Sequence, residues 1–215
     1  MAEVTGAVIL AGGRSRRMGT DKALLRWGEF TFLERILSQL EHFPEVLISA
    51  GEPGQYAEFG LPVIADIYPN RGPIGGLYSA LKCCRSPFLL VLSCDTPLFE
   101  RGLGEYLAAL ASDDFDAIVP MTCNGWRQPL CAVYAKTCTD ILFAQIQAGN
   151  NRMRDALSLM RTRYIPMTEL PYQDMVLSDI NLPEQYHALI QSEYLSPDIA
   201  ESRGYWSKVP VSSST

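Results

Sequence analysis

The chain has 215 residues, of which 47% are hydrophobic and 20% are charged, and its formal net charge is −6. This length and apolar content allow one domain with a sizeable core. The acidic balance argues against a nucleic-acid partner, which needs a broad basic face, but it allows a small anionic ligand in a cleft with a few cations. No apolar stretch approaches the ~20 residues of a membrane span, so we expect no membrane partner.

The strands and helices of the first half alternate. Continuous apolar runs predict strands at residues 4–10, 45–50, 61–66, 88–95 and 115–122. Helical spacing predicts helices at residues 31–43, 72–84 and 102–110. The run at 88–95 is the most continuously apolar, which places it at the centre of the sheet. The alternation predicts a mostly parallel α/β sheet.

The second half is less regular. Asn124 and Gly125 lie between apolar segments and predict a hairpin. Further helices are predicted at residues 137–148, 152–160 and 184–192, with Pro183 in the first turn of the last, and short strands at 164–167 and 175–179. Periodicity is lost from Leu195 onward. We therefore expect one domain over residues 1–194 and a flexible tail over 195–215.

The six cysteines and two histidines show no metal-binding spacing. No C-x-x-C pair occurs, and His42 and His187 both fall in predicted helices, which argues against a zinc site and against a Ser/His/Asp hydrolase. The first apolar run is only about four residues, too short for a secretory signal. We therefore expect reduced thiols in a cytosolic protein.

Three predicted strands end in unusual residues. These segments are AVILAGGRSRRMGTDK at 7–22, DIYPNRGPIGG at 66–76 and SCDTPL at 93–98. In open α/β sheets ligands bind beyond the carboxyl ends of the strands, and a parallel sheet brings those ends to one edge. We therefore expect the three segments to form one ligand site.

The first segment combines glycines with cations. Gly12 and Gly13 let the backbone approach a ligand and form a nest of N–H groups, while Arg17 and Lys22 can neutralise phosphate oxygens. A solvated surface turn and a basic arm are the alternatives. The spacing matches neither G-x-x-x-x-G-K-[ST] nor G-x-G-x-x-G, so a P-loop or a dinucleotide dehydrogenase gains no support.

The other two segments each allow two interpretations. Asp95 ends the most buried strand, where it would hold Mg²⁺ beside substrate phosphates or cap the next helix. Asp66 would be a ligand contact or a turn residue. The glycines at 72, 75 and 76 would admit a base or a phosphate to a helix N-terminus or form a tight turn.

Residues 10–22, LAGGRSRRMGTDK, resemble the L-A-G-G-x-S-x-R-M-G-x-D-K signature of the molybdenum cofactor guanylyltransferases, the MobA family. Further segments resemble later parts of that family's pattern, in the expected order: RGPIGGLYSAL at 71–81, SCDTPL at 93–98, RQPLCAVY at 127–134 and DINLPEQY at 179–186. The resemblance implies a three-layer α/β/α, Rossmann-like, mostly parallel sheet of the nucleotide-diphospho-sugar transferase fold.

The same resemblance implies a reaction. GMP would pass from GTP to the terminal phosphate of Mo-molybdopterin, with Mg²⁺ as cofactor, to give molybdopterin guanine dinucleotide and pyrophosphate. A molybdoenzyme or a chaperone would receive the product. The L-A-G-G form resembles the guanylyl branch, whereas the cytidylyl branch tends to carry L-A-A-G. The alternatives are a related enzyme that uses CTP or another phosphate acceptor, and a non-catalytic nucleotide-binding adaptor.

The resemblance also implies site residues. Asp95 would contact GTP and hold Mg²⁺, and Lys22 would bind phosphates; with Arg17, a contact that we add on physical grounds, these form the expected catalytic set. The expected nucleotide contacts are Leu10, Ala11, Gly12, Gly13, Lys22, Gly51, Asp66, Gly75, Asp95 and Asn181. The chain departs from the family pattern at Gly51, where Asn is common, at Asp179, where the first Asn of the last segment is common, and at Leu182, where Thr is usual.

Overall fold

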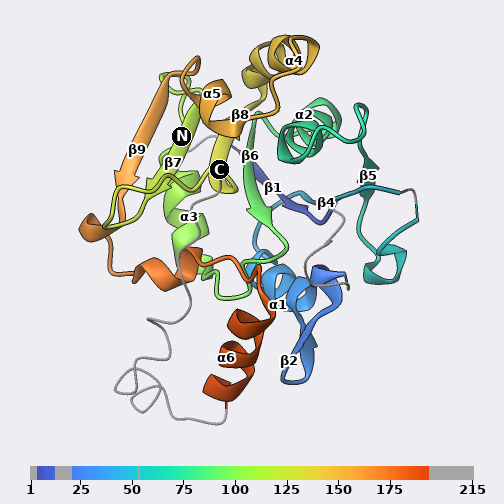
Figure 1. Cartoon of the computed structure of the whole chain (residues 1–215). Helices are drawn as coiled ribbons and strands as arrows, with labels where there is room; N and C mark the ends of the chain where they lie inside the picture. Colours follow the sequence, from blue (N-terminus) through green and yellow to red (C-terminus); the bar gives the residue numbers. More distant parts are fainter. Residues whose placement is uncertain (1–3, 13–20, 53, 194–215) are drawn as a thin grey trace.

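A computed structural model of the chain describes residues 4–12, 21–52 and 54–193. A seven-stranded sheet with the order β5-β4-β1-β6-β8-β7-β9 forms its centre (Figure 1). The strands are β1 Thr5–Leu10, β4 Val46–Ala50, β5 Val63–Ala65, β6 Phe88–Ser93, β7 Ala117–Met121, β8 Cys131–Ala135 and β9 Thr162–Pro166. β8 pairs antiparallel with both β6 and β7, and the other pairings are parallel. The predicted mostly parallel sheet is therefore confirmed.

Helices cover both faces of this sheet, which confirms the three-layer architecture. The helices are α1 Phe32–Gln39, α2 Pro73–Cys83, α3 Arg101–Ala109, α4 Thr139–Gln147, α5 Met153–Leu157 and α6 Pro183–Glu193. α2 and α4 lie on one face, whereas α1 and α3 lie on the other (Figure 1). None of the described helices combines the length and apolar character that a bilayer crossing requires.

Strand β6 is the centre of the core, as its sequence predicts. Leu89, Leu90, Val91 and Leu92 are all 0% exposed. Its neighbour β1 pairs with it in parallel over its whole length, from Thr5 opposite Phe88 to Leu10 opposite Ser93. Because both strands are covered on both faces, their sequences are apolar runs rather than alternating patterns.

Helix α1 is shorter than predicted. It begins in a capping box, in which the Thr31 side chain accepts from the Glu34 N–H and the Glu34 carboxylate accepts from the Thr31 N–H. It ends at Gln39, and Phe43 N–H then donates to the Leu40 carbonyl in a turn, at 2.9 Å. Pro44 disfavours helical backbone at the preceding residue. His42 therefore lies in a turn and not in a helix.

A small hairpin that the sequence analysis missed follows the first loop. It contains β2 Arg26–Trp27 and β3 Phe30–Thr31, after a 3₁₀ turn, η1, at Lys22–Leu24. The strands are too short for a period-2 pattern to stand out.

The predicted hairpin in the second half is confirmed at its turn. Gly125 has a φ of 81°, its N–H donates to the Thr122 carbonyl at 2.9 Å, and Thr122 N–H donates to the Trp126 carbonyl at 2.9 Å. The chain then returns as β8, which lies between β6 and β7.

The prediction of a strand at residues 175–179 is wrong. A 3₁₀ turn, η5, occupies Asp174–Leu177 instead. Val176 and Leu177 are adjacent and both buried. A turn can bury both side chains while its backbone bonds locally, as when Ser178 N–H donates to the Met175 carbonyl at 3.0 Å. The remaining 3₁₀ turns are η2 Ala57–Phe59, η3 Lys136–Cys138 and η4 Met167–Glu169. The predicted tail lies outside the described residues.

Candidate active site

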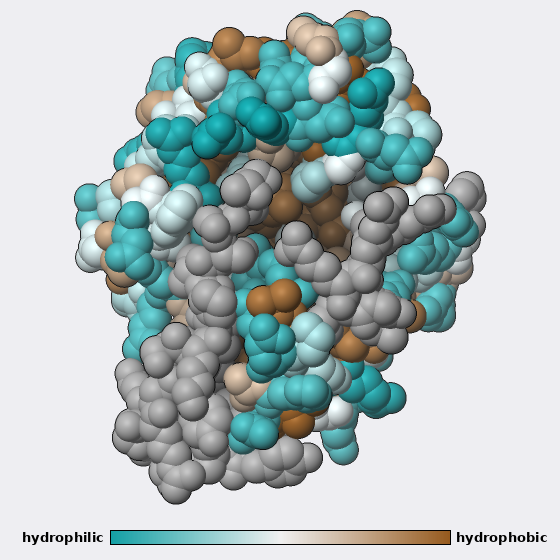
Figure 2. Space-filling view, viewed as in Figure 1, coloured by the Kyte–Doolittle hydropathy of each residue, from teal (hydrophilic) through white to brown (hydrophobic). Residues whose placement is uncertain are grey.

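The carboxyl ends of β1, β4 and β6 are joined directly. Ala11 N–H donates to the Ser49 carbonyl at 2.8 Å, and Cys94 N–H donates to the Leu10 carbonyl at 3.1 Å. β5 pairs in parallel with β4, with Ala65 opposite Ala50. The predicted convergence of the ends of β1, β5 and β6 at one edge is therefore confirmed. Figure 2 shows a hollow near the middle of this face, with apolar residues on its floor and polar residues along its upper rim.

Three residues from distant parts of the chain meet at this edge. Lys22 Nζ lies 2.8 Å from Asp95 Oδ2 and also donates to Asn181 Oδ1. The Lys22 and Asp95 side chains are each only 14% exposed. Because charges with little solvent around them interact strongly, the Lys22–Asp95 pair is a strong electrostatic interaction at this edge. We call Lys22, Asp95 and Asn181 the lysine cluster.

The lysine cluster is held by the ends of β6 and α6. The Ser93 hydroxyl donates to Asp95 Oδ1, and Ile180 N–H donates to the Asp95 carbonyl at 2.8 Å. Asn181 N–H donates to Gln185 Oε1 of α6 at 2.6 Å. The alternative that Asp95 caps the next helix is wrong, because α3 begins at Arg101 with Glu100 as its cap.

Asp95 fits a metal that is shared with substrate phosphates. The described residues contain no group of three or more His, Cys, Asp or Glu side chains that could hold an ion alone. Mg²⁺ is typically bound through one or two carboxylates together with phosphates and water, rather than in an all-protein cage. One carboxylate at a strand end suits that mode, and the Lys22 ammonium is its ion-pair partner.

A second group of polar residues lies across β4 and β5. Asp66 follows β5, and the Ser49 hydroxyl lies 3.5 Å from Asp66 Oδ1. Burial raises the pKa of the Asp66 carboxyl, and the Ser49 hydrogen bond only partly opposes this effect. Among the residues whose positions are described, no hydrogen bond connects Asp66 with the lysine cluster.

Two glycines of α2 face this second group at close range. A Cβ on Gly75 would lie 2.8 Å from the Tyr68 carbonyl oxygen, and a Cβ on Gly76 would lie 3.0 Å from Ser49 Oγ and 3.6 Å from Asp66 Oδ1. A side chain at Gly75 would therefore displace the loop that contains Tyr68, whereas a side chain at Gly76 would press on the side chains of Ser49 and Leu10. Gly75 and Gly76 allow the N-terminus of α2 to lie close to the strand ends. A helix N-terminus favours the binding of anions.

Asp66→Asn is expected to make the protein more stable at neutral pH. The folded-state pKa of Asp66 is raised above its unfolded value, so its ionisation costs folding free energy as the pH rises through that raised pKa. Asparagine removes this cost. Denaturant unfolding of both proteins between about pH 4 and about pH 7 should show a difference that grows with pH. A difference that is constant with pH would contradict the expectation.

The first loop is described only at its two ends. A Cβ on Gly12 would lie 3.3 Å from the Gly51 backbone nitrogen, so the lack of a side chain at Gly12 lets the end of β1 lie close to the backbone that follows β4. A Cβ on Gly51 would meet nothing within 4 Å, so the space beside it would admit the side chain that the family pattern commonly has there. Gly13 and Arg17 lie outside the described residues.

The sequence analysis missed several residues that shape this edge. Ser49 and Ser93 each contact a predicted site carboxylate. A serine at the end of an apolar run is a weak sequence signal that could have indicated Ser49 and Ser93 as site residues. The Tyr56 hydroxyl, which contacts Asp21 and Ala11, had no signal in the sequence.

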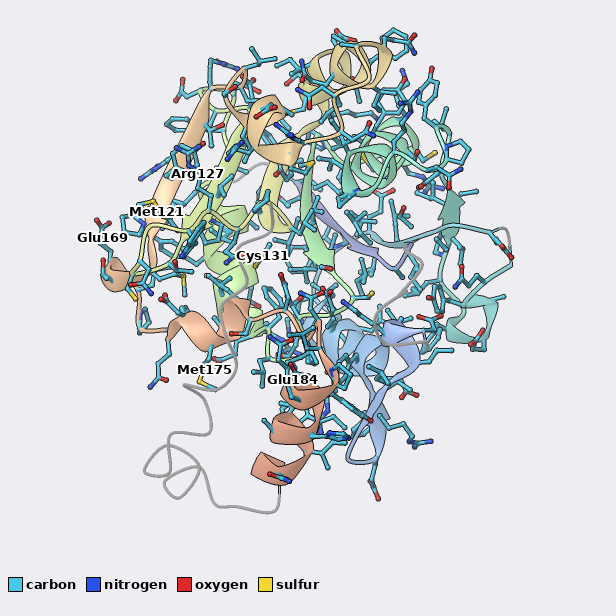
Figure 3. All side chains as sticks on the ribbon, viewed as in Figure 1. Met121, Arg127, Cys131, Glu169, Met175 and Glu184 are labelled. Atoms are coloured by element: carbon cyan, nitrogen blue, oxygen red, sulfur yellow. The ribbon has the colours of Figure 1, made fainter. Side chains whose placement is uncertain are left out.

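The β7–β8 connection borders the other end of the sheet. Figure 3 labels Arg127, which belongs to this connection. Its guanidinium lies 4.6 Å from the centre of the Tyr164 ring of β9. Cys123 N–H donates to the Asp174 carboxylate of η5 at 2.9 Å. These contacts fix the connection against its neighbours.

A separate groove of about 760 Å³ runs along α1. Its lining includes Phe30, Arg35, Leu37, Phe43 and Phe59. None of the described site residues lines it, so the groove and the strand-end site are distinct surfaces.

A mostly parallel α/β/α sheet with glycine-lined strand ends and a lysine–carboxylate pair at its carboxyl edge suits an enzyme that binds a nucleotide there, and the family match identifies the class as nucleotidyltransferase. The sequence profile of the MobA-like NTP transferase domain matches residues 7–164. The chain belongs to this family.

Relatives and solved structures agree with this assignment. A Clostridium perfringens protein named "Probable molybdenum cofactor guanylyltransferase" is 35% identical over 193 residues, which cover 87% of this chain and 96% of the relative. A Pelotomaculum thermopropionicum protein of the same name is 38% identical over 167 residues, 77% of this chain and 80% of the relative.

The fold is shared with solved structures of low sequence identity. The Archaeoglobus fulgidus molybdopterin-guanine dinucleotide biosynthesis protein A superposes with a TM-score of 0.76 at 21% identity, covering 86% of this chain and 97% of that one. The Thermus thermophilus 2-C-methyl-D-erythritol 4-phosphate cytidylyltransferase superposes with a TM-score of 0.64 at 18% identity, covering 88% and 98%. The chain therefore has the nucleotide-diphospho-sugar transferase fold.

Proposed function

We propose that this protein transfers GMP from GTP to the terminal phosphate of Mo-molybdopterin and releases pyrophosphate. The observation that carries the proposal is the lysine cluster at the carboxyl edge of the sheet, in a chain related to proteins named for this reaction. The product is molybdopterin guanine dinucleotide.

The reaction needs no protein nucleophile. An oxygen of the terminal molybdopterin phosphate attacks the α-phosphorus of GTP, and the bond from that phosphorus to the oxygen that bridges to the β-phosphate breaks. The bridging oxygen leaves with the bonding electrons as part of pyrophosphate. Positioning and charge neutralisation are then the main tasks of the protein, which agrees with the absence of a histidine from the lysine cluster.

Lys22 and Asp95 have opposite tasks in this scheme. The Lys22 ammonium binds phosphate oxygens as a compact charge. Asp95 holds Mg²⁺ beside the phosphates, with Ser93 donating to its second oxygen. When bound, the metal neutralises charge that develops on the phosphoryl oxygens. The 2.8 Å ion pair between Lys22 and Asp95 keeps the ammonium and the carboxylate close enough to act on the same phosphates.

The remaining predicted residues would bind the rest of the nucleotide and orient the cluster. Backbone of Leu10, Ala11 and Gly12 meets the nucleotide, and Gly13 and Arg17 belong to the same proposed loop. Gly51, Asp66 and Gly75 form the second part of the nucleotide site. Asn181, which accepts from Lys22, orients the ammonium.

We place this activity in the cytoplasm. All six cysteines are free, as expected of a protein in a reducing compartment. Burial raises the pKa of the Cys84 thiol to about 11, so this thiol stays protonated and unreactive. The dinucleotide would pass to a molybdoenzyme or to its chaperone.

The proposed reaction is tested by incubating the protein with Mg²⁺, molybdopterin or Mo-molybdopterin, and each nucleoside triphosphate in turn. We expect pyrophosphate release and a guanine dinucleotide product with GTP only. Product with CTP instead would identify a cytidylyltransferase. GTP binding without pyrophosphate release would identify a non-catalytic adaptor. A reaction without Mg²⁺ in the presence of a chelator would contradict the assigned role of Asp95.

A further inference from the structure

The Tyr56 hydroxyl lies between the two described ends of the first loop. It donates to Asp21 Oδ2 at 2.7 Å, and the Ala11 carbonyl lies 3.2 Å away as a second, longer acceptor. Ala11 directly follows β1 and Asp21 directly precedes η1, yet Tyr56 comes from the connection between β4 and β5. One hydroxyl from a distant segment therefore contacts both ends of the loop.

This contact reaches Lys22 through Asp21. The other carboxylate oxygen, Asp21 Oδ1, accepts from Ala23 N–H at 3.0 Å and so caps η1, in which Lys22 is the first residue. Gln55 Nε2 donates to the Tyr56 hydroxyl at 3.0 Å and lies 3.3 Å from Asp21 Oδ2. Tyr56 and Gln55 thus hold one carboxylate oxygen of Asp21. The other oxygen fixes the start of η1, the turn that contains Lys22.

Tyr56 occupies an unusual backbone conformation. Its φ is 62° and its ψ is 20°, in the left-handed region, and the residue is only 3% exposed. A non-glycine residue in that region costs free energy and persists where its surroundings determine it strongly. The burial of the Tyr56 ring and the three polar contacts of its hydroxyl stabilise this backbone conformation. Burial and the Asp21 carboxylate also raise the pKa of Tyr56 above its usual range, so the hydroxyl remains a donor.

We propose that Tyr56 is a positioning residue, whose hydroxyl sets the place of Lys22 by holding Asp21 against the end of β1. This inference rests on the proposed function in one respect, namely that Lys22 binds the triphosphate. Tyr56 itself lies behind Asp21 and needs no contact with the ligand.

Tyr56→Phe removes the hydroxyl and keeps the ring. Tyr134→Phe is the matched control, because the Tyr134 hydroxyl is also buried and donates to a backbone carbonyl, that of Pro129, at 2.8 Å. Without any nucleotide, we expect Tyr56→Phe to speed hydrogen–deuterium exchange at the Ala23 amide, whereas Tyr134→Phe leaves it unchanged. Unchanged exchange at Ala23 in Tyr56→Phe would overturn the positioning role.

Triphosphate affinity gives the second measurement. We expect Tyr56→Phe to weaken GTP binding by about 10-fold, the effect typical of residues that orient a ligand-binding group. In a Lys22→Met background the same change should alter GTP affinity by less than about twofold, because a residue that acts through Lys22 has nothing left to position. Equal effects in both backgrounds would overturn the proposal.

The two proposals can fail separately. If the unsubstituted protein binds no GTP while the Ala23 amide still responds to Tyr56→Phe, the proposed function fails and the positioning of η1 by Tyr56 stands. If GTP binding depends on Lys22 but neither measurement responds to Tyr56→Phe, the proposed function stands and the role of Tyr56 is wrong.

Discussion

Asp95→Asn is expected to lower the turnover of nucleotidyl transfer by about 10³-fold or more. The substitution keeps the size of the side chain and its hydrogen bond from Ser93, but removes the negative charge that we assign to holding Mg²⁺. Turnover measured across a Mg²⁺ titration checks this. Chelation of the metal should abolish activity in the unsubstituted protein and change nothing further in the variant.

Asp116→Asn is the matched control for Asp95→Asn. Asp116 is 13% exposed and forms an ion pair with Arg161 at 2.7 Å, so its burial and pairing resemble those of Asp95. Hydrogen bonds from Arg161 hold the pKa of Asp116 below its usual range, and this pair therefore stabilises the fold above that range. Asp116→Asn should lower stability and leave turnover intact. If Asp95→Asn only lowers stability as well, Asp95 is structural.

Lys22→Met should weaken GTP binding by about 10- to 100-fold, the effect of losing a hydrogen bond between charged groups. Methionine approximates the length of the lysine side chain without its charge. The change also leaves Asp95 without its ammonium partner, so Mg²⁺ should bind more tightly in the absence of nucleotide. Calorimetric titrations with GTP and with Mg²⁺ alone measure both effects.

Lys136→Met provides the comparison for Lys22→Met. Lys136 Nζ donates to the Cys84 carbonyl, and Lys136 N–H donates to the Pro87 carbonyl at 2.8 Å, just before β6 begins. It therefore lies at the opposite edge of the sheet from Lys22. Its substitution should reduce stability without altering GTP affinity. Equal affinity losses in the two variants would mean that the loss in Lys22→Met comes from general destabilisation.

The apolar runs predicted the strands of the first half well, since burial on both faces leaves a local pattern. The burial of β6 agrees with the sequence analysis. The later predictions were weaker. A turn at Asp174–Leu177 replaces the strand predicted at 175–179, and the β2–β3 hairpin was not predicted. Short segments take their conformation from packing rather than from periodicity.

The candidate site divides in the same way. The sequence by itself determined which residue types stand at the strand ends: glycines after β1, a carboxylate after β6 and a lysine beyond the first loop. Only the tertiary structure decided that Lys22 meets Asp95 and Asn181, and that Tyr56 reaches Ala11 and Asp21. Strand ends follow from local burial and turn chemistry. Contacts between residues far apart in the chain depend on how the whole sheet packs. A local sequence pattern does not predict this packing.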